Sequence, residues 1–170
     1  IYRTRVSTGG VVSWIRYQVV SFGDTVPAQI ESLAVGDMTL DGMVDIVLGI
    51  NPGGSESGVS QLTNFGVDGS GNFRQWESRR LPHTVIDPGT GRLANLGRVK
   101  DIAVGDTDGD GDLDIVYISD EGGGDRALNN VWHYQNTNRG IASGYVETNV
   151  WTSAFFNEKE KAFAIELDYI

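Results

Sequence analysis

The chain has 170 residues, of which 39% are hydrophobic, a formal net charge of −10 and no cysteine. This length and apolar content suffice for one domain with a sizeable core, and they exclude a disordered chain. The negative charge argues against nucleic acid or an anionic membrane as a partner, and the lack of cysteine excludes disulfides, thiolate metal sites and cysteine nucleophiles.

The segment 1–28 is predicted to hold the outer strands of a partial structural unit. Two β-type runs, Tyr2–Val6 and Val11–Tyr17, flank a Gly-Gly turn. We interpret Trp14 as the equivalent of Trp132 in a later unit. Because the chain starts without Met, we expect that a leader has been removed or that the chain is a piece of a longer protein.

The segment 29–98 is predicted to form a first complete unit of four strands followed by a linker from residue 81 onward. Short β-branched and aromatic runs separated by Gly, Asn and Asp are typical of antiparallel strands. The expected strands are Ile30–Val35, Ile46–Ile50, Val59–Phe65 and Phe73–Arg79.

A loop of nine residues lies between the first two of these strands, with oxygen-bearing groups at alternate positions. Such hard ligands on a tight loop suit calcium. The predicted ligands are the side chains of Asp37, Thr39, Asp41 and Asp45 and the backbone carbonyl of Met43.

The segment 99–155 repeats this plan, and residues 156–170 are interpreted as the start of a further unit. The first two expected strands again flank a nine-residue loop. The expected strands are Val99–Val104, Ile115–Ser119, Asn130–Gln135 and Gly144–Trp151.

The loop of the second unit superposes on the first loop without a gap, at an offset of 69 residues. Its carboxylates repel one another unless a cation lies among them, and a solvated acidic turn is the alternative. An EF-hand is excluded because it needs a Glu at position twelve, whereas position twelve of this loop is Tyr117. The segments on both sides of the loop are also β-type and not helical. Since Thr39 replaces one carboxylate, we expect the first loop to bind more weakly. The predicted ligands here are Asp106, Asp108, Asp110, Asp114 and the carbonyl of Asp112.

The shared pattern A-V-G-D-x-(D/T)-x-D-G-x-x-D-I-V, from near Ile30 onward, resembles the FG-GAP and VCBS repeats of calcium-binding β-propellers. Phe-Gly pairs occur at 22–23 and 65–66, but no Gly-Ala-Pro follows, which favours the VCBS-like branch. The resemblance implies an all-β fold of propeller type, with two complete four-stranded blades and partial blades at both ends. Because propellers need at least four blades, we expect packing against further blades or other chains.

The same resemblance implies a non-catalytic, calcium-stabilised module for binding, adhesion or surface assembly. Two Ca²⁺ sites, a protein or carbohydrate partner and no membrane insertion are expected. Cytosolic calcium is too scarce for such loops, which favours an extracellular or cell-surface location. Two alternatives stay open: the propeller domain of a secreted, polysaccharide lyase-like enzyme, and a structural subunit of a filament or surface layer.

The remaining candidate residues are aromatic or imidazole side chains. His83 and His133 have no sequence partner, and we expect them to be structural or exposed. The four tryptophans are expected to fill the space between packed sheets, with stacking on sugars as the alternative. They are Trp14, Trp76, Trp132 and Trp151.

Overall fold

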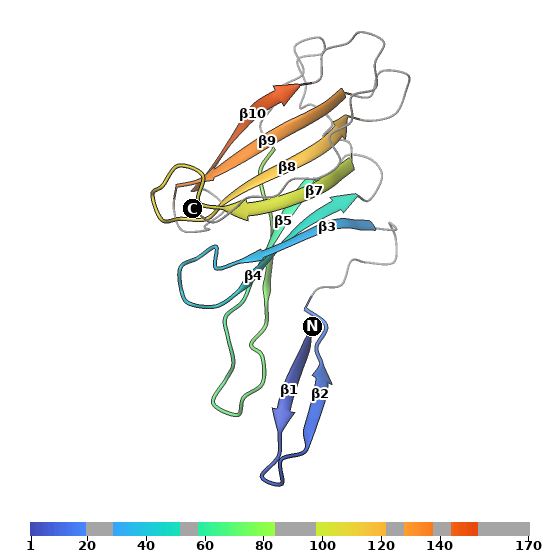
Figure 1. Cartoon of the computed structure of the whole chain (residues 1–170), viewed down its shortest axis with the longest axis vertical. Helices are drawn as coiled ribbons and strands as arrows, with labels where there is room; N and C mark the ends of the chain where they lie inside the picture. Colours follow the sequence, from blue (N-terminus) through green and yellow to red (C-terminus); the bar gives the residue numbers. More distant parts are fainter. Residues whose placement is uncertain (20–28, 52–57, 84–97, 122–127, 138–143, 153–170) are drawn as a thin grey trace.

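The computed structural model of the chain describes residues 1–19, 29–51, 58–83, 98–121, 128–137 and 144–152 (Figure 1). Ten β-strands in these segments form three antiparallel sheets, which confirms the expected all-β class. No helix in the described part of the chain has the length and apolar character needed to cross a bilayer. The predicted further unit at 156–170 lies outside the described residues.

The first four-stranded sheet has the order β3-β4-β5-β6, so each strand pairs with its neighbour in sequence. All seven residues of β4 are buried, because this central strand is covered on both faces. The strands are β3 (Gln29–Gly36), β4 (Asp45–Asn51), β5 (Gly58–Thr63) and β6 (Glu77–Arg80).

The second sheet repeats this order as β7-β8-β9-β10. A β-bulge interrupts the pairing of the first two strands in both sheets, after Ile30 in β3 and after Val99 in β7. These positions are 69 residues apart, as the two loops are. Residues separated by this offset therefore occupy the same place in the strand pairing of the two sheets. The strands are β7 (Arg98–Gly105), β8 (Asp114–Glu121), β9 (Leu128–Asn136) and β10 (Tyr145–Thr152).

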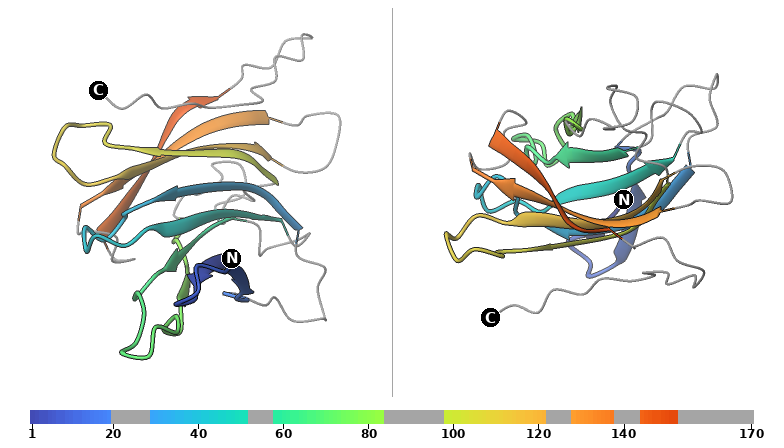
Figure 2. Two further views of the ribbon diagram at one scale, coloured as in Figure 1. Left: turned by 60° about the horizontal axis from the view of Figure 1, so that its bottom comes forward. Right: turned by 90° about the horizontal axis from the view of Figure 1, so that it is seen from above.

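The two sheets lie against each other, with β3 and β4 beside β7 (Figure 2). Gly49 and Gly36 are positions where the two repeats approach closely. A Cβ on Gly49 would lie 2.7 Å from Cγ1 of Val99, and one on Gly36 would lie 2.7 Å from Cδ1 of Leu113. One apolar core therefore spans both sheets. It consists of Met38, Val47, Val59, Leu81, Val99, Ile102, Val104, Ile115, Tyr117, Trp132, Tyr134 and Tyr145.

The N-terminal strands β1 (Tyr2–Val6) and β2 (Val12–Arg16) form a separate two-stranded hairpin. It contacts the segment between β5 and β6 through the Tyr17 ring, whose centroid lies 4.8 Å from that of Phe73. Trp14 is 66% exposed, whereas Trp132 is 1% exposed. The two indoles therefore differ in burial, because no second sheet covers this hairpin in the described structure, and their equivalence stays a prediction.

The outer strand of the first sheet is shorter than predicted. Only Glu77–Arg80 pair with β5, and Phe73 makes an isolated bridge to Val67. The Asp68 carboxylate accepts hydrogen bonds from the backbone N–H groups of Ser70 and Asn72, which closes the chain into a tight turn instead of a longer strand.

The tryptophan expectations have mixed outcomes. Trp132 and Trp76 are buried, as packing between sheets predicts, whereas Trp14 is exposed. The side chain of Trp151 lies outside the described residues. Of the three indoles that the structure describes, two therefore serve the core.

Candidate metal centre

The loop from Asp106 to Asp114 curls because two glycines adopt left-handed backbone conformations. Gly109 has φ of 80° and Gly111 has φ of 89°, values that residues with a Cβ rarely adopt. Both oxygens of Asp106 then accept backbone hydrogen bonds, from Gly109 N at 2.8 Å and Gly111 N at 2.9 Å. The loop is thus wound around its first carboxylate.

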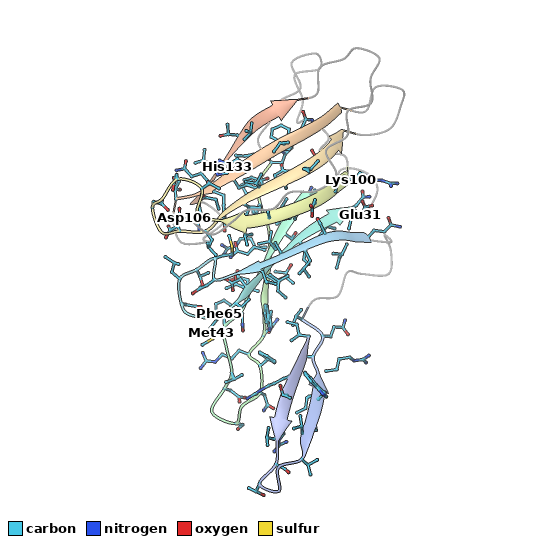
Figure 3. The ribbon with its side chains drawn as sticks, in the orientation of Figure 1. Glu31, Met43, Phe65, Lys100, Asp106 and His133 are labelled. Atoms are coloured by element: carbon cyan, nitrogen blue, oxygen red, sulfur yellow. The ribbon has the colours of Figure 1, made fainter. Side chains whose placement is uncertain are left out.

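Three carboxylates of this loop converge. Asp106, Asp108 and Asp114 each offer an oxygen, and these oxygens all lie within 4.8 Å of one another, so the group could hold a metal ion. Figure 3 places Asp106 at the end of the β7 ribbon, on a loop that projects from the sheet. Three like charges this close are unfavourable without a counter-charge. The chemistry of the donor set therefore fits a hard cation.

Asp110 and Asp112, also predicted ligands, are outside this carboxylate group. Asp110 instead accepts a hydrogen bond from Asp112 N at 2.9 Å. That hydrogen bond lowers the pKa of Asp110, but desolvation and the neighbouring carboxylates raise it by more, so the net pKa lies above the ordinary value. The raised pKa of Asp110 thus reflects desolvation first and the neighbouring carboxylates second.

Asp114 differs from the other carboxylates because its side chain is completely buried. One oxygen accepts from Asn136 N at 2.8 Å, and the other accepts from Thr107 N at 2.9 Å and from the Thr107 hydroxyl. Asn136 in turn donates its side-chain amide to the carbonyls of Leu113 and Met38. Asp114 and Asn136 therefore tie this loop to β9 and to the loop of the first sheet.

Two side chains of β9 flank the carboxylates and were not predicted for this site. His133 Nε2 lies 2.8 Å from the Thr107 hydroxyl and 3.7 Å from Oδ2 of Asp114, and Figure 3 shows His133 close to Asp106. Gln135 donates its amide to Asp108. Alternation along β9 puts both residues on one face, which is the only signal that the sequence carries for them.

The loop from Asp37 to Asp45 has the same backbone course. Leu40 has φ of 56° and Gly42 has φ of 83°, matching Gly109 and Gly111 of the second loop. Asp37 accepts from the backbone N–H groups of Asp41 at 3.1 Å and Gly42 at 2.8 Å. The two loops are therefore structural as well as sequence repeats.

The ligand atoms of this first loop are less concentrated. Among the described residues, only the Asp106 loop brings three metal-type side chains within 4.8 Å of one another. The Oγ1 atom of Thr39 is buried, and no described residue forms a hydrogen bond with it. The hydroxyl oxygen is thus available as a metal ligand. It lies at the position that Asp108 occupies in the other loop.

Asp45 repeats the role of Asp114. It is buried, and its oxygens accept from Met38 N at 3.1 Å and Asn64 N at 2.8 Å. Burial raises the pKa of Asp45, although the two backbone hydrogen bonds oppose this. Asn64 also donates to the carbonyl of Val44, as Asn136 does to Leu113. The asparagine at the end of each third strand is a repeated element that the sequence comparison missed, since its offset is 72 residues instead of 69.

Replacing Leu40 with glycine should stabilise the protein. A non-glycine residue in the left-handed region costs about 1–2 kcal/mol, and part of this gain is offset by the greater freedom of glycine in the unfolded chain. We expect a net gain of about 0.5 kcal/mol in the free energy of unfolding by urea titration. A loss of stability would show that the exposed Leu40 side chain contributes contacts worth more than the strain.

His83 is the second histidine, and it forms a buried pair with Glu147. Its Nδ1 lies 2.8 Å from a Glu147 oxygen, and the two side chains are 10% and 1% exposed. The Tyr117 hydroxyl donates to the same carboxylate at 2.7 Å, and burial raises the pKa of this tyrosine well above its ordinary value. The expectation of a structural histidine agrees with this position, which fastens the segment after β6 onto β10.

Comparison with known proteins assigns no family to this arrangement. No protein-family model, curated protein or solved structure matches the chain. The resemblance of the loops to FG-GAP and VCBS repeats therefore stays a prediction, and the chemistry of the site rests on its own residues.

Proposed function

We propose that the chain is a calcium-stabilised binding or surface-assembly module built from propeller-type blades. The observation that carries this proposal is the convergence of Asp106, Asp108 and Asp114, whose oxygens lie within 4.8 Å of one another. Carboxylates on a tight loop, with further oxygens nearby, are the ligands that Ca²⁺ prefers. The Asp110 side chain and the Asp112 carbonyl complete the proposed ligand set.

The site is proposed to be structural because of where its ligands are attached. Asp114 begins β8, and its hydrogen-bond partner Asn136 ends β9 and also contacts the Met38 carbonyl in the first loop. With a cation bound, repulsion among the carboxylates becomes attraction, and these strand ends are held together. The function would then be to keep a rigid surface for a partner outside the cell.

A second and weaker Ca²⁺ site is proposed in the first loop. Its ligands would be Asp37, Thr39, Asp41, Asp45 and the Met43 carbonyl. The unpartnered Oγ1 of Thr39 supports this assignment, because a buried oxygen without a hydrogen bond is available to a cation. Because Thr39 offers a neutral hydroxyl where the other loop has the carboxylate of Asp108, we expect the first loop to bind Ca²⁺ more weakly than the second.

Thermal unfolding with EGTA and with millimolar calcium tests this proposal. Calcium at about a hundredfold its dissociation constant adds about 2.7 kcal/mol, which should raise Tm by about 5–10 °C. Asp108→Asn should remove most of this rise while folding normally in EGTA. Magnesium should give a smaller rise, since it demands a stricter octahedral geometry.

The matched control is Glu77→Gln, which removes the same charge from exposed β6 and should keep the full calcium response. Equal Tm values in EGTA and calcium for the unmodified chain would refute the structural metal site. An equal loss of response in Glu77→Gln would show a general charge effect instead of a defined site.

A further inference from the structure

We propose that an exposed apolar patch beside the first loop binds a basic, amphipathic segment of a partner protein. This inference rests on the binding function proposed above, for which it names a contact surface and a class of partner. Contiguous exposed apolar side chains on a soluble domain are typical of interaction sites. The first-loop patch consists of Leu40, Met43, Val44, Phe65 and Val67, which are between 41% and 54% exposed.

The first-loop patch joins the metal-type loop to the segment that follows β5. The Met43 side chain lies over Gly66, where an added Cβ would be 3.3 Å from the Met43 Cε atom. The side-chain amide of Asn64 donates to the Val44 carbonyl at 3.1 Å. Figure 3 places Met43 and Phe65 side by side. The two segments therefore present one continuous apolar surface.

The backbone of Leu40 indicates that this surface is not a by-product of folding. Its φ of 56° lies in the left-handed region, which is unfavourable for a residue with a Cβ, and its side chain stays 42% exposed. The second loop has Gly109 at the position of Leu40 and Asp112 at the position of Met43. The first loop thus keeps a strained backbone that gains little burial in return. Strain of this kind is found mainly where a side chain serves a function.

The charges around the first-loop patch favour a basic partner. Asp41 lies within the loop part of the patch and Asp68 follows Val67, and both carboxylates are exposed. Neither forms an ion pair with a described residue. The segments 37–45 and 64–68 contain no Lys or Arg, and the whole chain has a net charge of −10. A segment with apolar anchors and Lys or Arg between them therefore matches the patch in both respects.

Calcium should weaken this contact, because Asp41 is also a proposed ligand of the first loop. A bound cation would offset the negative charge that attracts the basic partner. The affinity should be about 2–5-fold lower in millimolar calcium than in EGTA, as for the loss of an exposed charge pair. Equal affinities in the two buffers would count against the Ca²⁺ site of the first loop and not against the patch, whose binding is measured in EGTA.

Isothermal titration calorimetry in EGTA, with a short synthetic amphipathic peptide of Leu and Lys, tests the proposal. The unmodified chain should bind this probe at a one-to-one ratio. Leu40→Gly should weaken binding about 5–10-fold, because an apolar anchor is lost, while it stabilises the fold as predicted above. Asp68→Asn should weaken binding about 2–5-fold.

Two control variants remove comparable groups from other surfaces. Val12→Gly removes an apolar side chain that is 56% exposed on the hairpin, and Glu77→Gln removes an exposed charge from β6. Both should bind the probe like the unmodified chain. A control peptide with Glu in place of Lys should not bind.

Equal affinity of the unmodified chain and Leu40→Gly for the probe, or binding of the Glu peptide, would overturn the proposal. Sedimentation with phosphatidylcholine vesicles that depends on Leu40 would also overturn it and assign the patch to a lipid surface. Self-association in sedimentation velocity that depends on Leu40 would overturn it in favour of a second copy. Failure of the calcium-stabilised function would appear separately, as an absent Tm shift in calcium.

Discussion

Replacing Asp114 with alanine should lower the free energy of unfolding by about 3 kcal/mol even in EGTA. Its carboxylate is fully buried and accepts hydrogen bonds from the backbone N–H groups of Asn136 and Thr107. Alanine leaves both donors without this partner, and each unsatisfied buried group costs about 1–3 kcal/mol. Tm should fall by about 6–12 °C in calorimetry.

The comparison with Asp108→Asn separates this structural role from metal binding. Asp108 is exposed. In EGTA, Asp108→Asn should leave the free energy of unfolding nearly unchanged, because removing this charge relieves repulsion within the loop. Asp114→Asn should lose less stability than Asp114→Ala and more than Asp108→Asn. Its amide oxygen can still accept a hydrogen bond from one of the two backbone N–H groups. If Asp114→Ala unfolds like the unmodified chain in EGTA and differs from it only in calcium, the hydrogen bonds that the Asp114 carboxylate accepts contribute little to the free energy of unfolding.

Replacing Gly49 with alanine should cost about 2–3 kcal/mol, because an added methyl group forces the two sheets apart. The new Cβ would lie 2.7 Å from Cγ1 of Val99 and 2.3 Å from Oγ of Ser32. The Ser32 hydroxyl can rotate away, but Val99 is fully buried between the sheets. Urea unfolding would measure the loss.

A double-mutant cycle identifies the cause of this loss. Val99→Ala removes the methyl groups that the new Cβ meets, so Gly49→Ala should cost much less in that background than alone. Gly69→Ala is the control, because a Cβ there meets no atom within 4 Å. Strictly additive effects of the two core changes would show that the sheets do not approach at this point as described.

The sequence by itself was enough to predict the strands and the loops of both sheets. Their signals are local: alternating β-branched residues predict strands, and oxygen-bearing residues at alternate positions predict a tight loop of calcium-type ligands. The offset between Asp37 and Asp106 reappears as the same backbone course, with Leu40 in the conformation of Gly109. The prediction failed for Phe73, where the turn built on Asp68 competes with the strand.

Only the tertiary structure decided what surrounds the loops and which faces are covered. Asn64 and Asn136 reach the loops across 19 and 22 residues of chain, and His83 meets Glu147 across 64. Equivalent residues such as Leu33 and Ile102 have the same pattern in sequence, yet one is exposed and the other is buried. Burial depends on which sheet lies opposite, and that is a property of packing between distant segments, which no local spacing encodes.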